Sequence, residues 1–325
     1  MLKIVKTDKY VIAFNPQTGV EIVSGTEGNL DPFILEFPNL MDIGVMGNCP
    51  NKCHFCYQGQ KEQPNMKIED YKTLMDEASN FVMQVALGGR GDPNLHENFN
   101  EIVEYTRSKN IIPNYTTSGR NLTDEQIEIS KNCGAVAVSM YNLDYTFDSL
   151  KRLMDAGIKT NIHYMLTKKN LAEACQIMCG IDIWRGKVDL NRLNAIIFLL
   201  FKPQGSGKNL KEYILDDHDI ETFSDALNIS RSAFKLGMDS CMVNRLKKVN
   251  RIRKQDEMFV DTCEGARYSV YVSPDMKLVP CSFGNHDEDG VSLRGKNIKK
   301  VWDSERFDIF RKILEKDPAH CPFEL

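Results

Sequence analysis

The sequence predicts an α/β fold, a partial (β/α)6 barrel of the TIM-like type followed by a small C-terminal domain. Six short apolar runs recur between residues 41 and 201, and stretches of helix length with one apolar face separate them. Strands that are buried on both faces and alternate with helices form a parallel sheet with right-handed crossovers. Six such units are too few for the closed eight-stranded barrel, so we expect an open one.

The expected barrel strands are Met41–Met46, Val82–Leu87, Ile111–Thr116, Ala135–Met140, Thr160–Leu166 and Ala195–Phe201. The expected helices between them include Ile68–Asn80, Asn98–Lys109, Asp124–Asn132 and Asp148–Ala156. Ahead of the barrel, a turn separates two short strand patterns, which predicts a hairpin or lid at Tyr10–Phe14 and Val20–Ser24.

The alternation stops after about residue 215. A helix over Ile220–Leu236, a hairpin of Ser269–Val272 with Leu278–Cys281, and a final helix over Ile298–Glu315 are expected there. We therefore divide the chain into an N-terminal hairpin or lid (1–40), the barrel (41–236) and a small C-terminal domain (237–325).

Composition narrows the class of protein. The net charge of −4 indicates neither a nucleic-acid groove nor an anionic membrane surface, and no apolar run reaches the length of a membrane span. The start of the chain lacks the features of a secretory signal, so a cytoplasmic location is expected. Ten cysteines in that reducing compartment indicate metal binding or catalysis rather than disulfides.

Three cysteines, Cys49, Cys53 and Cys56, follow the first barrel strand with the spacing C-x3-C-x2-C. Thiolates this close together can hold three corners of one iron–sulfur cube, and the fourth iron is then free to bind a small molecule. A structural zinc site is the alternative. It needs a fourth ligand, which His54 could supply only with strain because it lies between two of the cysteines.

This triad, with aromatic Phe55 before its third cysteine at the end of the first strand of a β/α series, resembles the radical S-adenosylmethionine (SAM) superfamily. The resemblance covers about residues 41–215. It implies that the triad ligates a 4Fe–4S cluster whose fourth iron is chelated by S-adenosylmethionine. It also implies that Gly88 and Gly89 meet the methionyl amino group, although Arg90 stands where the family has an acidic residue.

The same resemblance marks polar residues on the next strands. Ser118 lies in a segment similar to the family's Thr-Asn-Gly, and Ser139 ends strand four where the family often contacts the cofactor. Asn161 and His163 share one face of strand five, from which they could reach ribose or carboxylate. Ordinary hydrogen bonding at strand ends is the alternative for each of them. Ligands bind open parallel sheets at the carboxyl ends of the strands.

The segment from Cys263 to Cys281 resembles the C-terminal domains called SPASM, or twitch in their short form, with Met276 in place of the family's usual glycine. This implies an auxiliary 4Fe–4S cluster on Cys263, Cys281 and Cys321 in a twitch-like auxiliary-cluster domain. Cys241 is either its fourth ligand, a buried thiol, or a hydrogen-atom donor near the substrate. Helical positions assign Cys133, Cys175 and Cys179 to packing.

The resemblance implies an enzyme that cleaves S-adenosylmethionine by one electron, supplied by a flavodoxin or ferredoxin, and uses the 5′-deoxyadenosyl radical to abstract hydrogen. The leading expectation for the substrate is a peptide or protein, matured by crosslinking, epimerisation or side-chain oxidation. One alternative is tailoring of a small molecule such as a nucleotide, sugar or cofactor precursor. The other is a non-catalytic iron–sulfur electron-transfer protein.

Overall fold

The computed structural model describes residues 2–59, 61–141, 143–230 and 232–323. Its strands form a three-stranded sheet of order β1-β2-β3 and a ten-stranded sheet of order β10-β9-β8-β7-β6-β5-β4-β11-β12-β13. In the larger sheet, each strand from β4 to β9 pairs in parallel with the next. These strands are β4 (Leu40–Ile43), β5 (Gln84–Leu87), β6 (Ile112–Thr117), β7 (Val136–Ser139), β8 (Thr160–Leu166) and β9 (Ala195–Leu200). The predicted α/β class with a partial barrel is confirmed.

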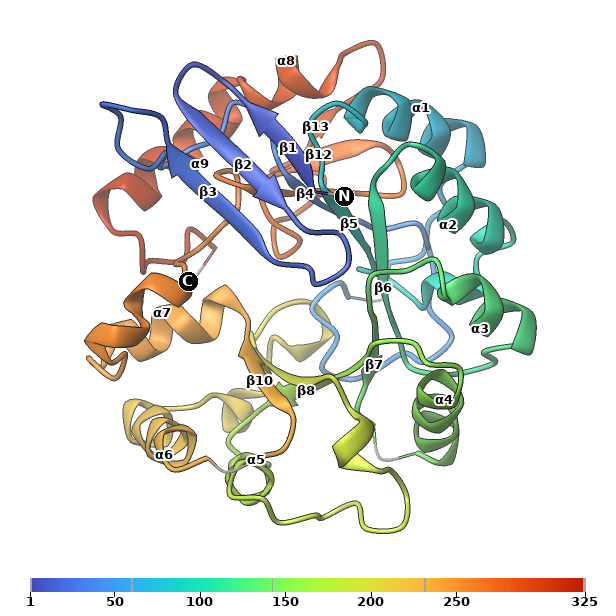
Figure 1. The fold of residues 1–325 in the computed structure, drawn as a ribbon, viewed down its shortest axis with the longest axis vertical. Coiled ribbons are helices and arrows are strands. Elements are labelled where there is room, and N and C mark those ends of the chain that lie inside the picture. Colours follow the sequence, from blue (N-terminus) through green and yellow to red (C-terminus); the bar gives the residue numbers. More distant parts are fainter. Residues whose placement is uncertain (1, 60, 142, 231, 324–325) are drawn as a thin grey trace.

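Helices cover the outer face of this sheet (Figure 1). Helix α1 shows why, because it buries Tyr71, Leu74, Met75 and Ala78 at helical spacing against the core. The helices are α1 (Ile68–Ala78), α2 (Phe99–Ser108), α3 (Asp124–Ser130), α4 (Asp144–Asp155), α5 (Leu171–Met178), α6 (Asp217–Asn228), α7 (Ser240–Lys248), α8 (Ile298–Trp302) and α9 (Glu305–Lys316). Short 3₁₀ turns lie at η1 (Pro93–Leu95), η2 (Leu190–Arg192), η3 (Gly205–Gly207), η4 (Lys211–Tyr213) and η5 (Lys254–Phe259). Across the described residues, no helix is both long enough and apolar enough to cross a bilayer.

Three of the predicted helices were wrong in extent. The helix expected to begin at Asp148 begins at Asp144. The helix expected to reach Leu236 ends at Asn228, and Lys235–Met238 form β10, which pairs in parallel with β9. Gly237 pairs with Ile197, and a Cβ there would lie 2.5 Å from Cδ1 of that side chain, which would have to turn away. A short apolar run does not distinguish a strand from a helical segment. The predicted final helix is divided into α8 and α9, and the second begins after Ser304.

The C-terminal residues extend the sheet of the barrel. Strand β11 (Ser269–Val272) pairs in parallel with β4, and β12 (Lys277–Val279) and β13 (Val291–Ser292) continue from it in antiparallel pairing. The expected boundary between residues 236 and 237 lies inside β10. The barrel and the C-terminal segment therefore share one sheet, and their division into domains stays a prediction.

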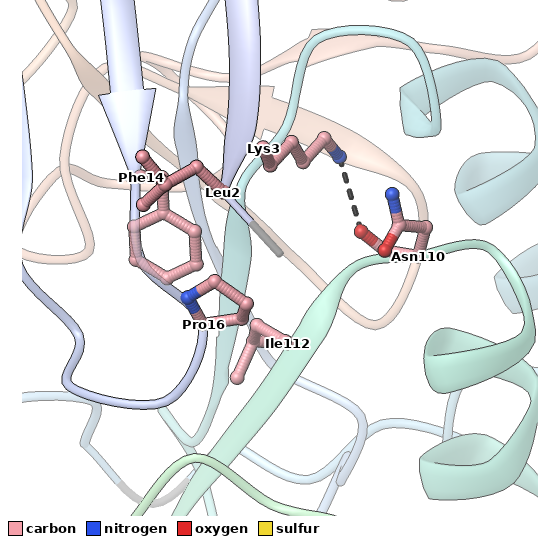
Figure 2. Close-up of a pocket in the computed structure, with 6 residues that line it drawn as sticks. All are labelled: Leu2, Lys3, Phe14, Pro16, Asn110 and Ile112. Carbon is pink, nitrogen blue, oxygen red and sulfur yellow. Dashed lines mark hydrogen bonds between the residues drawn. The ribbon is translucent and has the colours of Figure 1, made fainter.

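The N-terminal sheet consists of β1 (Lys3–Lys6), β2 (Tyr10–Phe14) and β3 (Glu21–Gly25). Three alternate side chains of β2 pack against Met83 and Ile112, which stand at the amino ends of β5 and β6. Lys3 Nζ donates to the Asn110 carbonyl at 3.1 Å beside a small cavity of about 110 Å³ (Figure 2). This sheet therefore covers the amino end of the barrel strands, away from the loop that carries the cysteine triad.

Candidate functional site

The cysteine triad lies on the loop that leaves the carboxyl end of β4. The Cys56 amide donates to the Cys53 carbonyl at 3.1 Å, and Lys52 turns the chain with a φ of 44°. Burial raises the pKa of the Cys53 and Cys56 thiols, and the neighbouring thiols of the triad raise it further. The three sulfur atoms are therefore near one another.

This donor set fits an iron–sulfur cluster. Three partly buried thiols next to one another are unfavourable as thiolates until a cation compensates their charge, and bound iron supplies that charge. Within the described residues, no three His, Cys, Asp or Glu side chains group as they would around a single metal ion. His54, the fourth ligand considered for zinc, has its Nε2 3.0 Å from the Tyr213 hydroxyl.

The glycine pair follows β5, and its two members have different surroundings. A Cβ on Gly88 would meet no heavy atom within 4 Å, so the backbone there borders open space, as close approach of a ligand requires. Gly89 has a φ of 80°, and a Cβ there would lie 2.6 Å from the Tyr271 hydroxyl. Arg90 points elsewhere, and its Nη2 donates to the Gln58 carbonyl at 2.8 Å.

Asp92 supplies a buried carboxylate that sequence reasoning missed. Its Oδ1 accepts the Ser118 amide at 3.0 Å, and the Ser118 hydroxyl donates to its Oδ2. Asn51, from within the cysteine loop, donates to the Ser118 hydroxyl at 3.0 Å. Burial raises the pKa of Asp92. The sequence feature that could have revealed it is an acidic residue two positions beyond Arg90. The hydrogen bonds of Asp92, Ser118 and Asn51 join the cysteine loop to the ends of β5 and β6.

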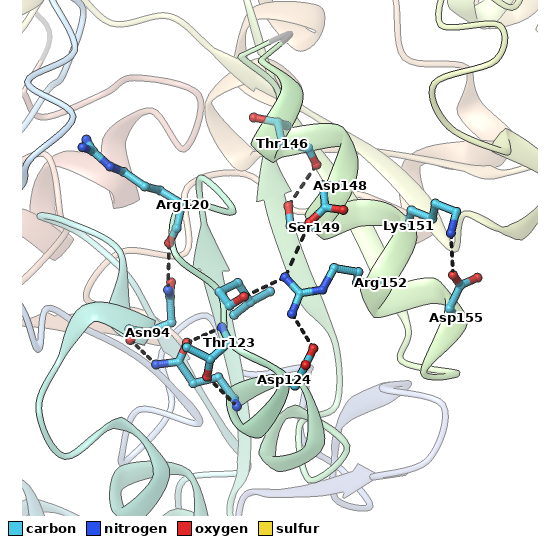
Figure 3. A network of polar contacts seen from close by, with 12 residues as sticks. Asn94, Arg120, Thr123, Asp124, Thr146, Asp148, Ser149, Lys151, Arg152 and Asp155 are labelled. Carbon is cyan, nitrogen blue, oxygen red and sulfur yellow. Dashed lines mark hydrogen bonds and ion pairs between the residues drawn. The ribbon is translucent and has the colours of Figure 1, made fainter.

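The loop after Ser118 is also held from its outer side (Figure 3). Asn94 donates to the Arg120 carbonyl at 3.2 Å, while Arg152 of α4 donates to the Leu122 carbonyl at 2.7 Å and pairs with Asp124. The Arg120 guanidinium turns the other way, and its Nη1 lies 3.2 Å from Asn51 Oδ1. Ser118 is thus fixed from both sides.

Tyr141, just beyond β7, is a second residue that the sequence did not reveal. Burial raises its pKa, and its hydroxyl is hydrogen-bonded to both Cys53 and Ser139. The Phe55 ring lies 6.0 Å from the Tyr141 ring. Tyr141 therefore joins Ser139, at the end of β7, to Cys53 and Phe55 of the cysteine loop.

The two residues predicted on β8 differ in position. Asn161 stands at the amino end of the strand, where its Oδ1 accepts from Asn194 at 2.7 Å, so the structure does not bring it to the cysteine loop. His163 lies two residues further on, and Thr116 Oγ1 is 3.4 Å from its Nδ1. Burial lowers the pKa of His163 to about 4, which keeps the imidazole neutral.

A second group of thiols forms beyond the carboxyl ends of β9 and β10. Cys241 is in the first turn of α7, Cys263 precedes β11, Cys281 follows β12, and Cys321 is in the C-terminal tail. Burial raises the pKa of Cys241, and it raises the pKa of Cys263 and Cys281 to about 12. Cys281 also raises the pKa of Cys241, and Cys321 raises those of Cys263 and Cys281, so the four thiols are within electrostatic reach of one another.

Lys202, at the end of β9, reaches into this second group. Its Nζ lies 3.1 Å from Cys321 Sγ and is also hydrogen-bonded to Cys241. Burial alone would lower its pKa, but the surrounding thiols Cys241, Cys321 and Cys281 raise it. Cys241 is thus placed with the cysteines expected to hold the auxiliary cluster.

Residues next to the two thiol groups contact one another. The Tyr57 ring, next to Cys56, lies 4.5 Å from the Phe283 ring, which follows Cys281 by two residues. Gln58 Nε2 donates to the Ser282 carbonyl at 3.1 Å. The Ser206 amide donates to the Cys56 carbonyl at 2.8 Å. The site therefore extends from the cysteine loop to the C-terminal cysteines.

Comparison with known families identifies the class. Residues 43–178, from β4 to the end of α5, match the model described as the Radical SAM superfamily. This match contains the triad, the glycine pair and the carboxyl ends of β5 to β8. Residues 43–178 therefore match a radical SAM domain, and proteins of this superfamily use a 4Fe–4S cluster and S-adenosylmethionine.

Individual relatives are distant. A stretch of 90 residues, 26% of this chain, is 24% identical to the tungsten-containing aldehyde ferredoxin oxidoreductase cofactor-modifying protein of Pyrococcus furiosus and spans 25% of it. The chain thus covers about a quarter of that relative's length.

Solved structures share the fold over most of the chain. Streptococcus suis SuiB bound to S-adenosylmethionine superposes with a TM-score of 0.66 at 16% identity, covering 86% of this chain and 68% of that one. SuiB bound to the precursor peptide SuiA gives 0.68 at 18% identity, covering 86% and 67%. The enzyme anSMEcpe with bound AdoMet gives 0.63 at 17% identity, covering 84% and 79%. These likenesses concern the fold.

Proposed function

We propose that this enzyme abstracts a hydrogen atom from a peptide or protein, using one 4Fe–4S cluster on the cysteine loop and an auxiliary 4Fe–4S cluster on Cys241, Cys263, Cys281 and Cys321. The observation that carries the auxiliary cluster is the meeting of four thiols from separate parts of the chain around Lys202. When bound, the first cluster and S-adenosylmethionine supply a 5′-deoxyadenosyl radical after one-electron reduction. A flavodoxin or ferredoxin is the proposed reductant.

The residues around the triad have positioning roles in this proposal. Gly88 leaves room for the methionyl end of the cofactor, and the Asp92–Ser118–Asn51 network keeps the cysteine loop against β5 and β6. The rings of Phe55 and Tyr141 keep water from the reacting carbon. His163, neutral and buried, is a hydrogen-bonding group inside the barrel rather than a charged one.

The peptide assignment has one source of support. SuiB bound to the precursor peptide SuiA, and anSMEcpe bound to the Cp18Cys peptide, both have the fold of this chain. A small-molecule substrate remains the competing function, and a direct test separates the two.

The test uses an extract of the encoding organism grown in heavy water and separated by size. Deuterated 5′-deoxyadenosine forms when the radical takes deuterium from the substrate, and mass spectrometry detects it. We expect this product with the macromolecular fraction. We also expect that protease treatment of this fraction abolishes the product, although S-adenosylmethionine is supplied in every assay. Product formed only with the low-molecular-weight, protease-resistant fraction contradicts a peptide substrate.

A further inference from the structure

Lys202 is buried in an unusual setting. Only 8% of the residue is exposed, and Gln204 hydrogen-bonds back to its carbonyl at 2.8 Å, which fixes the backbone at the end of β9. The ammonium lies 3.1 Å from Cys321 Sγ and 4.5 Å from the centre of the Phe283 ring. No ion pair with a carboxylate is found for it among the described residues, and the carboxylate whose charge interacts with it is Asp239 at the start of α7.

A buried charge needs a compensating charge, and neutral thiols do not supply one. A 4Fe–4S cluster on four thiolates is anionic, so it would compensate the ammonium at this position. The same contact acts on the cluster, since net charge and hydrogen bonds to the sulfur ligands set the reduction potential of iron–sulfur centres. The ammonium of Lys202 therefore lies where it would offset the negative charge of an auxiliary cluster.

We infer that Lys202 is a positioning residue for the auxiliary cluster, in which its ammonium donates a hydrogen bond to the thiolate of Cys321 and holds the cluster at a higher reduction potential. The inference rests on the auxiliary cluster of the proposed function. It assigns the lysine to electron transfer at the second group of thiols rather than to substrate binding. The Phe283 ring that faces the ammonium also lies 4.5 Å from the tilted ring of Tyr57, next to Cys56 of the first group.

The experiment isolates the auxiliary cluster. In a chain with Cys49, Cys53 and Cys56 all changed to alanine, anaerobic reconstitution leaves the second thiol group as the proposed site for iron. A redox titration followed by electron paramagnetic resonance then gives the midpoint potential of that cluster alone. The same background carries Lys202→Met, Lys202→Arg and, as the matched control, Lys208→Met at an exposed lysine six residues further along.

We expect Lys202→Met to shift the midpoint potential to a more negative value, while Lys202→Arg and Lys208→Met stay near the parent. Loss of iron in Lys202→Met with retention in Lys202→Arg also supports the inference, because it shows that the cation is needed. An unchanged potential in Lys202→Met, or equal loss of iron in both Lys202 variants, overturns it. If the parent triple variant binds no iron, the auxiliary cluster itself fails, which is a different result.

Discussion

The two thiol groups of this enzyme are assembled in different ways. Cys49, Cys53 and Cys56 lie on one loop, so these residues, which are close in the sequence, are also close in space. Cys241, Cys263, Cys281 and Cys321 come from the start of α7, the two sides of the β11–β12 hairpin and the C-terminal tail. The first group needs a turn, whereas the second needs the finished sheet, because β10 and β11 stand on opposite sides of the barrel strands. A local motif therefore identifies the first site, and the fold identifies the second.

The largest effect is expected at the first group. Cys53→Ala removes one of the three thiolates on the loop, so 5′-deoxyadenosine formation should be lost completely. Iron should fall from about eight to about four per chain as one of two 4Fe–4S clusters is lost. Mass spectrometry and iron analysis check this. Cys179→Ala, at an exposed cysteine at the end of α5, is the control and should retain both. Retained 5′-deoxyadenosine in Cys53→Ala would show that the loop does not hold the cluster.

Cys241→Ala tests whether Cys241, which follows the edge strand β10, is a ligand of the auxiliary cluster. We expect iron to fall to about four per chain, because three thiolates around a buried lysine hold a cluster less tightly than four. Cleavage of S-adenosylmethionine at the first cluster should be retained. Cys175→Ala on α5 is the matched control. Unchanged iron in Cys241→Ala would leave Cys241 as a buried thiol or hydrogen donor.

Asp42 on β4 is within electrostatic reach of Tyr57 and Tyr271, whose pKa values its charge raises. Burial, and then the charge of Glu264, raises the pKa of Asp42 to about 7. An acid whose pKa is raised in the folded state stabilises the fold at low pH, and this stability is lost as the pH rises through about 7. Unfolding free energy should therefore be lower at pH 8 than at pH 6, by roughly 1–2 kcal/mol.

Asp42→Asn keeps the shape of the side chain and removes the charge. Denaturant unfolding at both pH values should show a smaller difference for this variant than for the wild type. Part of the dependence should remain, because burial also raises the pKa of Glu21 to about 7. Equal pH dependence in variant and wild type would mean that Asp42 is not a buried acid of the folded protein.

The smallest effect concerns the hairpin between Cys263 and Cys281. Met276 has a φ of 65°, a left-handed backbone conformation that favours glycine. Its side chain is 6% exposed, so Met276→Gly relieves about 1–2 kcal/mol of backbone strain and loses about 2–5 kcal/mol of packing. We expect a net loss of about 2 kcal/mol in unfolding free energy, with a larger loss for Met276→Ala, which keeps the strain. A smaller loss for alanine than for glycine would contradict this account of the turn.

Much of the fold could be predicted from local patterns. Six strands and the helices that separate them follow from apolar runs and helical periodicity, and β8 has the predicted bounds. Strand β10 was missed because its few residues follow a helix and have no alternation of their own. The joining of β11 to β4 could not be predicted, since pairing between residues so far apart in the chain depends on the finished barrel.

The same limit applies to the site. The triad and Gly88 could be found from spacing and small residues, and Ser118 and Ser139 from their strand ends. Asp92, Asn51 and Tyr141 have no motif of their own, and their roles depend on loops that meet only in the folded chain. Asn161 was predicted from strand alternation, which gives the face of a strand but not the end of it. The contact of Lys202 with Cys321 likewise depends on the folded chain.

The central claim is that the chain holds two clusters on two differently built groups of thiols. Iron analysis after anaerobic reconstitution tests it directly, with the wild type compared to chains that lack either all cysteines of the first group or all cysteines of the second. The account predicts about eight irons per wild-type chain and about four in each deletion variant, with 5′-deoxyadenosine formed only where the first group remains. About four irons in the wild type, with no change when the second group is removed, would contradict it.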